Sequence, residues 1–196
     1  MEALSDGVFA FAVTVLVLDI AVPQGALTQS DLLVALGGEW RSYLSYLVSF
    51  ATIGAIWLAH SDITDYIARA NALLIRLNLV LLLTVSLIPF STRLLAEYLG
   101  RSGPERVAVT IYGINLLATG VLLSVLIRYA TGAGLVRPGV RDEEALMLTK
   151  RLTPMLGAYV VLIAVGLVLP TVAIVGYFAI ALYLIVWSQM RRRHQA

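Results

Sequence analysis

The chain has 196 residues, of which 60% are hydrophobic and only 13% charged, with a formal net charge of +2. A soluble domain usually carries about 25% charged residues, so this composition leaves too little polar surface to cover a water-soluble globule. It excludes a soluble domain and indicates a polytopic membrane protein.

Six apolar runs follow one another along the chain, each close to the roughly 20 residues that a helix needs to cross a bilayer. A segment in lipid must satisfy its own backbone hydrogen bonds, and the runs are too long for barrel strands, so we expect an all-α fold. The predicted spans cover residues 4–22, 40–60, 72–95, 107–129, 152–169 and 171–190, which together form a single transmembrane domain over residues 1–196.

The connections between these runs differ in length and content. Between the first two spans an apolar stretch follows Ser30, which would cap it as a short interfacial helix. Pro89 interrupts the third span. The connection over residues 131–150 begins rich in Gly and Pro, and Asp142 would then open a short helix leading into the fifth span. Pro170 alone separates the last two spans, which predicts a tight helical hairpin.

Positive side chains predict the orientation, since Lys and Arg accumulate on the cytoplasmic side of a membrane. With the N-terminus inside, nine lie in the inner connections and tail, and four lie at the outer helix ends. We therefore expect both termini in the cytoplasm. The inner nine are Arg69, Arg128, Arg137, Arg141, Lys150, Arg151, Arg191, Arg192 and Arg193, the outer four are Arg41, Arg93, Arg101 and Arg106, and Arg76 lies within the third span.

Several function classes are excluded. The chain has no cysteine and two histidines, so disulfides, thiolate metal sites and a zinc centre are not expected. The basic residues lie where membrane topology already requires them, so membrane lipid rather than nucleic acid is the expected partner of the basic tail. No nucleophile and base lie at usable helical spacing, so we expect no enzyme. The first apolar run lacks preceding basic residues and is long enough to span, so it is expected to remain in the mature protein.

The first span carries a continuous apolar stripe. At about 100° per residue, Phe11, Val15 and Leu18 lie within about 60° of one another, with Thr14 beside them. On pattern alone, such a stripe is more often a lipid-facing or packing surface than a functional one. Asp6 lies on the far side, and an acidic group near the membrane needs a partner in the protein.

A second set of residues is polar and near the cytoplasmic helix ends. Trp57 and His60 lie at the end of the second span, and Asn78 lies in an otherwise aliphatic run. Histidine and asparagine in lipid usually bond another helix, so a packing network is the simplest interpretation. Together with Ser5 and Asp6 they would form one polar cluster. Proton transfer through His60 is an alternative.

These residues occur in short motifs whose order and spacing matter more than any one of them. The motifs are Ser5-Asp6-Gly7-Val8-Phe9-Ala10, Leu18-Asp19-Ile20, Trp57-x-x-His60, Asn78 and Ile88-Pro89-Phe90-Ser91-Thr92. In this order they resemble the prokaryotic branch of the transmembrane protein 175 potassium channels. The resemblance is close over the first half of the chain, and the six-span layout extends it to the end.

The resemblance implies a homotetrameric, potassium-permeable cation channel of the bacterial cytoplasmic membrane, with the first helices around a central pore. In that family apolar side chains of the first helix constrict the pore, and a nearby hydroxyl contributes to ion preference. Carried over, Phe11, Val15 and Leu18 form the constriction and Thr14 the hydroxyl ring. Potassium is the implied permeant ion, and no cofactor is implied.

Two departures from the family pattern stand out. Family members usually have a branched aliphatic residue in place of Phe11, so a ring of phenylalanines would narrow or close the pore. They also usually have an arginine before the Ser-Asp pair. Either the chain starts upstream of Met1, or Asp6 finds another donor, for which His60 is the nearest candidate.

Two other functions remain open. A secondary transporter would need a midplane site made from broken helices and buried charge. Only Pro89 and Pro154 interrupt the spans, and no charge lies near mid-membrane. A proton-conducting channel would use Asp6 and His60.

Overall fold

The computed structural model describes residues 1–20, 22–23, 28–137 and 142–195. Nearly all of this part is helical, which confirms the all-α prediction. The elements are α1 (Glu2–Val15), a 3₁₀ helix η1 (Leu16–Asp19), α2 (Gln29–Gly38), α3 (Trp40–Tyr66), α4 (Ala72–Ser86), α5 (Ile88–Tyr98), α6 (Pro104–Gly132), α7 (Asp142–Gly166) and α8 (Pro170–Gln195).

Several helices are suited to crossing a membrane. Within the described ranges, four are long and apolar enough by length and composition, and a fifth apolar helix is shorter, at Thr153–Gly166. The four are Trp40–Tyr66, Ala72–Tyr98, Pro104–Gly132 and Pro170–Ser188. The first predicted span is divided between α1, with 14 residues, and η1, with four. Crossing by all six segments therefore stays a prediction.

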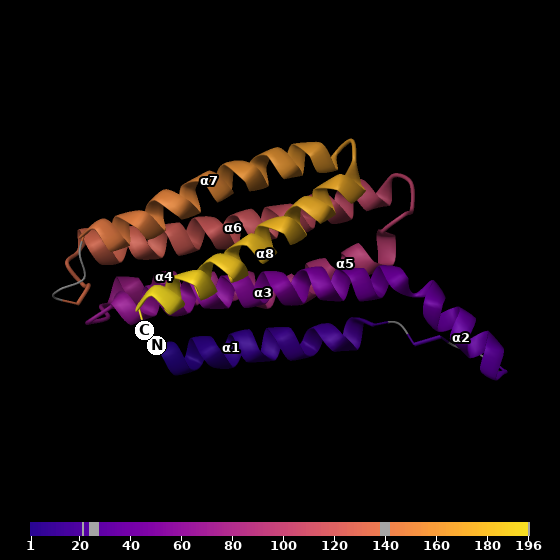
Figure 1. Ribbon diagram of the computed structural model, residues 1–196, viewed down its shortest axis with the longest axis horizontal. Helices are drawn as coiled ribbons and strands as arrows, with labels where there is room; N and C mark the ends of the chain where they lie inside the picture. The colour runs from indigo at the N-terminus through magenta and orange to yellow at the C-terminus, as the bar shows by residue number, and fades with distance from the viewer. Residues whose placement is uncertain (21, 24–27, 138–141, 196) are drawn as a thin grey trace.

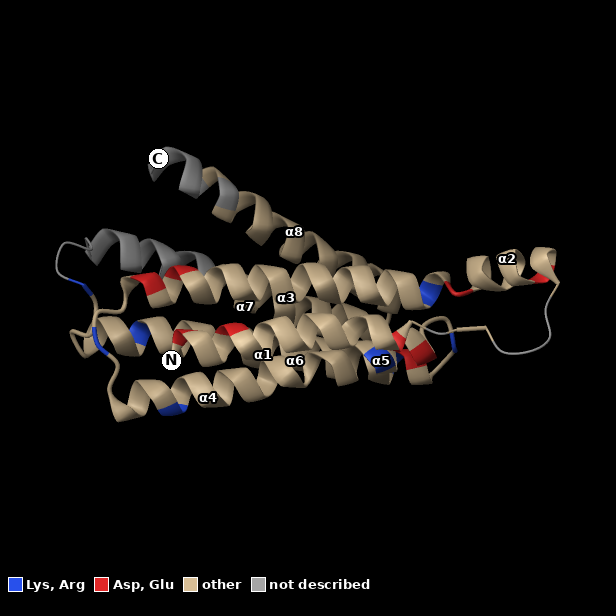
Figure 2. Ribbon diagram, turned by 90° about the horizontal axis from the view of Figure 1, so that it is seen from below, with Lys and Arg blue, Asp and Glu red and all other residues tan. Residues whose placement is uncertain are grey.

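The long helices run side by side along the long axis of the molecule, and α2 projects beyond one end (Figure 1). On one face of the bundle, α1 lies between α3 and α4 and packs against both (Figure 2). α6 and α7 form the layer farthest from α1 (Figure 1). α8 crosses obliquely and packs against α3 and α7. The described part of the subunit leaves the other face of α1 uncovered.

Proline has different effects in the two spans that contain it. Pro89 lies in the first turn of α5, where its missing N–H removes no helical hydrogen bond, and the preceding helix α4 ends at Ser86. Pro154, by contrast, lies inside the continuous helix α7. The short helix predicted to open at Asp142 is thus the first part of α7 and not a separate element. The Gly/Pro-rich start of that connection includes residues 138–141, which lie outside the described residues.

The short helix predicted after Ser30 begins earlier than expected. Thr28, not Ser30, caps α2: the Asp31 amide donates to Thr28 Oγ1 at 3.3 Å, and the Thr28 amide donates to Asp31 Oδ2 at 3.2 Å. This reciprocal pair needs an acceptor side chain three residues after the cap, which Thr28 has in Asp31. Hydrogen bonds from the hydroxyl and then the amide of Thr28 hold the pKa of Asp31 below its ordinary value. The cap assigned to Ser30 was wrong for this reason.

Close packing of α6 against α7 and α8 leads to a stability prediction. A Cβ added at Gly113 would overlap the hydroxyl of Tyr177 and lie 2.7 Å from Ile163 Cγ1. Gly113→Ala should therefore destabilise the protein by about 1–3 kcal/mol through overpacking. Gly157→Ala, where a Cβ meets nothing within 4 Å, is the matched control. Thermal unfolding of the detergent-purified proteins measures the difference, and equal melting temperatures would contradict the prediction.

Candidate functional site

α1 has one face in the bundle and one face outside it. Ser5, Phe9, Ala12 and Leu16 are buried and follow the four- and three-residue spacing of one helical face. Phe11, on the other face, is 70% exposed. Because the opposite face of α1 is buried in the bundle, the predicted stripe points away from the core of its own subunit.

The four stripe residues do not lie in identical surroundings. Leu18 is 79% exposed and Thr14 is exposed, whereas Val15 is half-buried beside Ser86 of α4 and Pro89 of α5. Phe11 and Val15 line a groove of about 380 Å³ whose other wall includes Pro89. The Thr14 hydroxyl donates to the Phe11 carbonyl at 2.9 Å, which leaves the oxygen of this exposed side chain able to accept a hydrogen bond. The stripe thus has one polar group that can accept a hydrogen bond or face a cation.

A buried chain of hydrogen bonds links three helices at the N-terminal end of α1. Asn78 Nδ2 donates to Ser5 Oγ at 3.0 Å, and Ser5 Oγ donates to the Met1 carbonyl at 3.2 Å. His60 Nε2 lies 2.8 Å from Asn78 Oδ1. A carbonyl oxygen can only accept, so His60 Nε2 carries the hydrogen of this bond. The chain satisfies polar groups on α1, α3 and α4 together.

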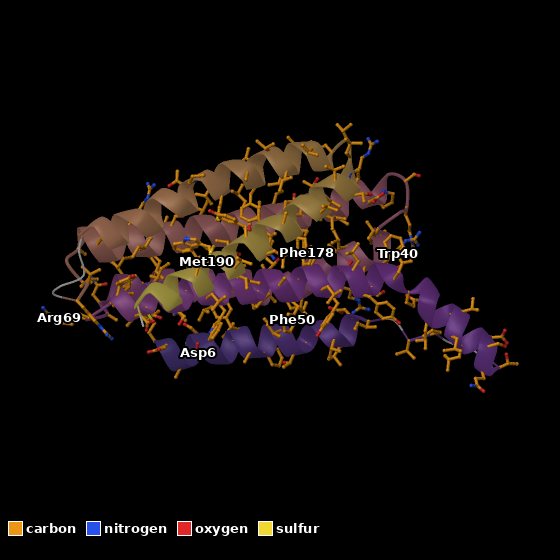
Figure 3. All side chains as sticks on the ribbon, viewed as in Figure 1. Asp6, Trp40, Phe50, Arg69, Phe178 and Met190 are labelled. Carbon is orange, nitrogen blue, oxygen red and sulfur yellow. The ribbon has the colours of Figure 1, made fainter. Side chains whose placement is uncertain are left out.

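Asp6 belongs to a separate pair. The Trp57 indole Nε1 donates to Asp6 Oδ1 at 3.0 Å, while His60 is directed to Asn78 and packs its ring 5.4 Å from that of Phe9. The donor to Asp6 in this structure is therefore Trp57, and not His60, which was the nearest candidate from the motifs. The predicted polar residues form two adjacent groups instead of one cluster, and Asp6 lies toward the end of the bundle opposite Trp40 (Figure 3).

A cluster of buried hydroxyls was missed by the sequence analysis. Ser49 Oγ donates to the Tyr112 hydroxyl at 3.1 Å, Tyr112 donates to Thr52 Oγ1 at 3.4 Å, and Thr92 Oγ1 donates to Ser49 Oγ at 2.6 Å. The available signal was the spacing of hydroxyl residues on one face of α3, including Ser45, Ser49 and Thr52. Across the described ranges, no three His, Cys, Asp or Glu side chains gather where they could hold a metal ion.

The sequence is similar to known membrane proteins. Residues 1–89 match the family described as endosomal/lysosomal potassium channel TMEM175. "Potassium channel Cha6605_3372" of Chamaesiphon minutus is 36% identical over 187 residues, which cover 93% of this chain and 91% of that protein. The chain belongs to the TMEM175 family. Another member, "Potassium channel B446_29190" of Streptomyces collinus, is 41% identical over 134 residues, which cover 68% of this chain and 65% of the relative.

The TMEM175 assignment also holds for the fold. The crystal structure of a lysosomal potassium-selective channel TMEM175 homolog from Chamaesiphon minutus superimposes with a TM-score of 0.85 and 34% identity. The match covers 95% of each chain. The resemblance inferred from the short motifs is therefore confirmed, and the TMEM175 fold extends well beyond residue 89.

The polar chain in this TMEM175 protein yields a second prediction. Asn78→Ala removes the partner of both His60 and Ser5, and a buried polar group left unpaired costs about 1–3 kcal/mol. The melting temperature of the purified protein should fall. Ser86→Ala is the control, because this exposed hydroxyl on the same helix bonds only to the Leu83 carbonyl in the described part of the subunit. If both variants have the melting temperature of the wild type, the hydrogen bonds of Asn78 contribute no stability.

Proposed function

We propose that this chain is a potassium-permeable cation channel of the bacterial cytoplasmic membrane, formed by four copies around a pore lined by α1. The exposed stripe on α1 carries this proposal. Phe11 and Leu18 are among the most exposed large apolar side chains of the subunit, although α1 is packed between two other helices. The names of the relatives as potassium channels support the same function.

The proposed topology has six crossings. α1 with η1, α3, α4 with α5, α6, α7 and α8 each cross once, both termini lie in the cytoplasm, and α2 lies at the outer surface. The excess of Lys and Arg in the inner connections supports this orientation. The exposed apolar residues of α2, such as Leu33 and Val34, suit a helix that lies in the membrane interface.

The pore constriction would consist of rings of Phe11, Val15 and Leu18, one side chain from each subunit. An apolar ring can exclude water and so gate ion flow without closing the path sterically. The Thr14 ring would supply the hydroxyls nearest the passing ion. Sodium holds its water more tightly than potassium, and few polar groups replace that water, so potassium selectivity should be modest.

The alternatives have less support from the geometry. A proton relay through Asp6 and His60 would need a continuous path, but these groups bond to different partners, Trp57 and Asn78. A transporter site would need buried charge at mid-membrane. Among the described side chains, the buried polar ones are Ser, Thr, His and Asn, and none is Asp, Glu, Lys or Arg.

The pore proposal predicts the effect of widening the Phe11 ring. Phe11→Ala should raise potassium flux several-fold and weaken discrimination against sodium, because the narrowest apolar ring becomes larger and less dehydrating. Flux from liposomes that contain the purified protein, with potassium, sodium and proton gradients compared, measures both effects.

Val161→Ala is the control for this experiment. Val161 is 61% exposed on α7, in the layer farthest from α1 (Figure 1). If Phe11→Ala and Val161→Ala change flux alike, or if Phe11→Ala only lowers protein yield, the stripe is a packing surface and the pore assignment fails.

The topology can be tested in the cysteine-free background of the natural chain. An impermeant thiol reagent applied to intact cells should label Gln29→Cys, at the start of α2, and should not label Ala70→Cys, between α3 and α4. Both positions are exposed in the subunit, so burial does not bias the comparison. Labelling of Ala70→Cys alone would show that the orientation is inverted.

A further inference from the structure

Arg76 is a charge on an otherwise apolar helix face, without a partner among the described residues. It lies on the outward face of α4 with Leu79 and Leu83, which are 48% and 60% exposed. Over the described ranges, Arg76 makes no hydrogen bond or ion pair. A cation within a membrane-spanning helix is costly unless it finds a partner or reaches the interface. The described part of the subunit provides no such partner.

The opposite flank of the subunit has the complementary charge. Glu2 and Asp6 are exposed one helical turn apart at the start of α1. Asp6 forms the end of a groove of about 310 Å³ between α1 and α3, lined on the α3 side by Gly54 and Trp57. A Cβ added at Gly54 would meet nothing within 4 Å. This groove therefore has room for side chains from outside the subunit.

The two flanks are placed to meet in a ring. α1 lies between α3 and α4, so the Asp6 groove is on one side of α1 and the outward face of α4 is on the other (Figure 2). A closed ring of identical subunits uses heterologous contacts, in which one flank of each copy meets the opposite flank of the next. With α1 facing the axis, the α4 face of one subunit would lie against the α1–α3 groove of its neighbour.

The charges also lie at matching depth. The bond between Asn78 and Ser5 places α4 and α1 at the same level at that point. Arg76 precedes Asn78 by two residues and Asp6 follows Ser5 by one, so their Cα atoms differ in depth by roughly 5 Å at 1.5 Å per residue. An extended arginine side chain can bridge this offset, and Glu2 lies one turn nearer the cytoplasm.

We propose that Arg76 of one subunit binds Asp6 of the next subunit, with Glu2 beside it, so that the neighbouring copy completes the Asp6–Trp57 site. The apolar residues of the α4 face, with Leu79 and Leu83 among them, then cover the groove between α1 and α3. This inference rests on the proposed tetramer. It assigns to Asp6 a second donor, which comes from outside its own chain.

Crosslinking between differently tagged copies tests the pairing. One copy carries Arg76→Cys, the other carries Asp6→Cys or Glu2→Cys, and a short bis-maleimide is added to membranes that contain both. A product with both tags is expected, because the proposed contact joins different subunits. Replacing Arg76→Cys by Val161→Cys, on α7, should abolish that product. Two acidic positions are used so that a folding defect in one variant does not decide the result.

A second measurement separates this inference from the channel proposal. Arg76→Gln should shift the detergent-purified protein from tetramer to smaller species, while Arg76→Lys should keep the tetramer. A wild type that is tetrameric and conducts potassium, with no Arg76 product and an intact Arg76→Gln tetramer, would overturn only the pairing and leave Arg76 to lipid headgroups. A wild type that neither forms a tetramer nor conducts would overturn the pairing and the channel together.

Discussion

The hydrogen-bonded chain from His60 through Asn78 to Ser5 fixes how α1 sits in the subunit, and the arrangement of the other α1 side chains depends on it. These side chains are buried, and a buried polar group without a partner is costly, so they must meet one another. Once Ser5 faces the bundle, helical geometry directs Phe9, Ala12 and Leu16 inward and the Phe11 face outward. A polar contact at one end of the helix thereby determines which apolar side chains are exposed along the rest.

The helical fold and the residues that share the exposed face of α1 could be predicted from the sequence, because they depend on the length and periodicity of apolar runs alone. Apolar runs of sufficient length predict membrane helices, and an angle of about 100° per residue brings Phe11 and Leu18 to one face without knowledge of the neighbours. The residues at which helices end were harder to predict. α3 continues to Tyr66, six residues past the predicted end, because hydropathy falls at the polar residues while backbone hydrogen bonding continues.

The partners within the polar site could not be predicted in the same way. Trp57 and His60 lie three residues apart on α3, so both are near one face and either could reach α1. The side chain that bonds Asp6 depends on the height and rotation of α1 against α3, which no local pattern contains. The hydroxyl cluster around Tyr112 could not be predicted either, since its members are distant in sequence and weakly polar. It joins α3 to α5 through Ser49 and Thr92, just beyond the break at Pro89.

The change from α-helix to 3₁₀ helix after Val15 has a consequence for the shape of the proposed pore. Side chains three residues apart eclipse one another in a 3₁₀ helix, whereas in an α-helix they are about 60° apart. Val15 and Leu18 are therefore nearly aligned along the helix axis, although Val15 is half-buried and Leu18 is exposed. If this single turn became α-helical, Leu18 would rotate by about 60° around the helix axis relative to Val15. Leu18 would also lie closer to Val15 along that axis, since the rise drops from about 2.0 to 1.5 Å per residue. In the proposed pore, the width at Leu18 therefore depends on the helical pitch of four residues, Leu16–Asp19.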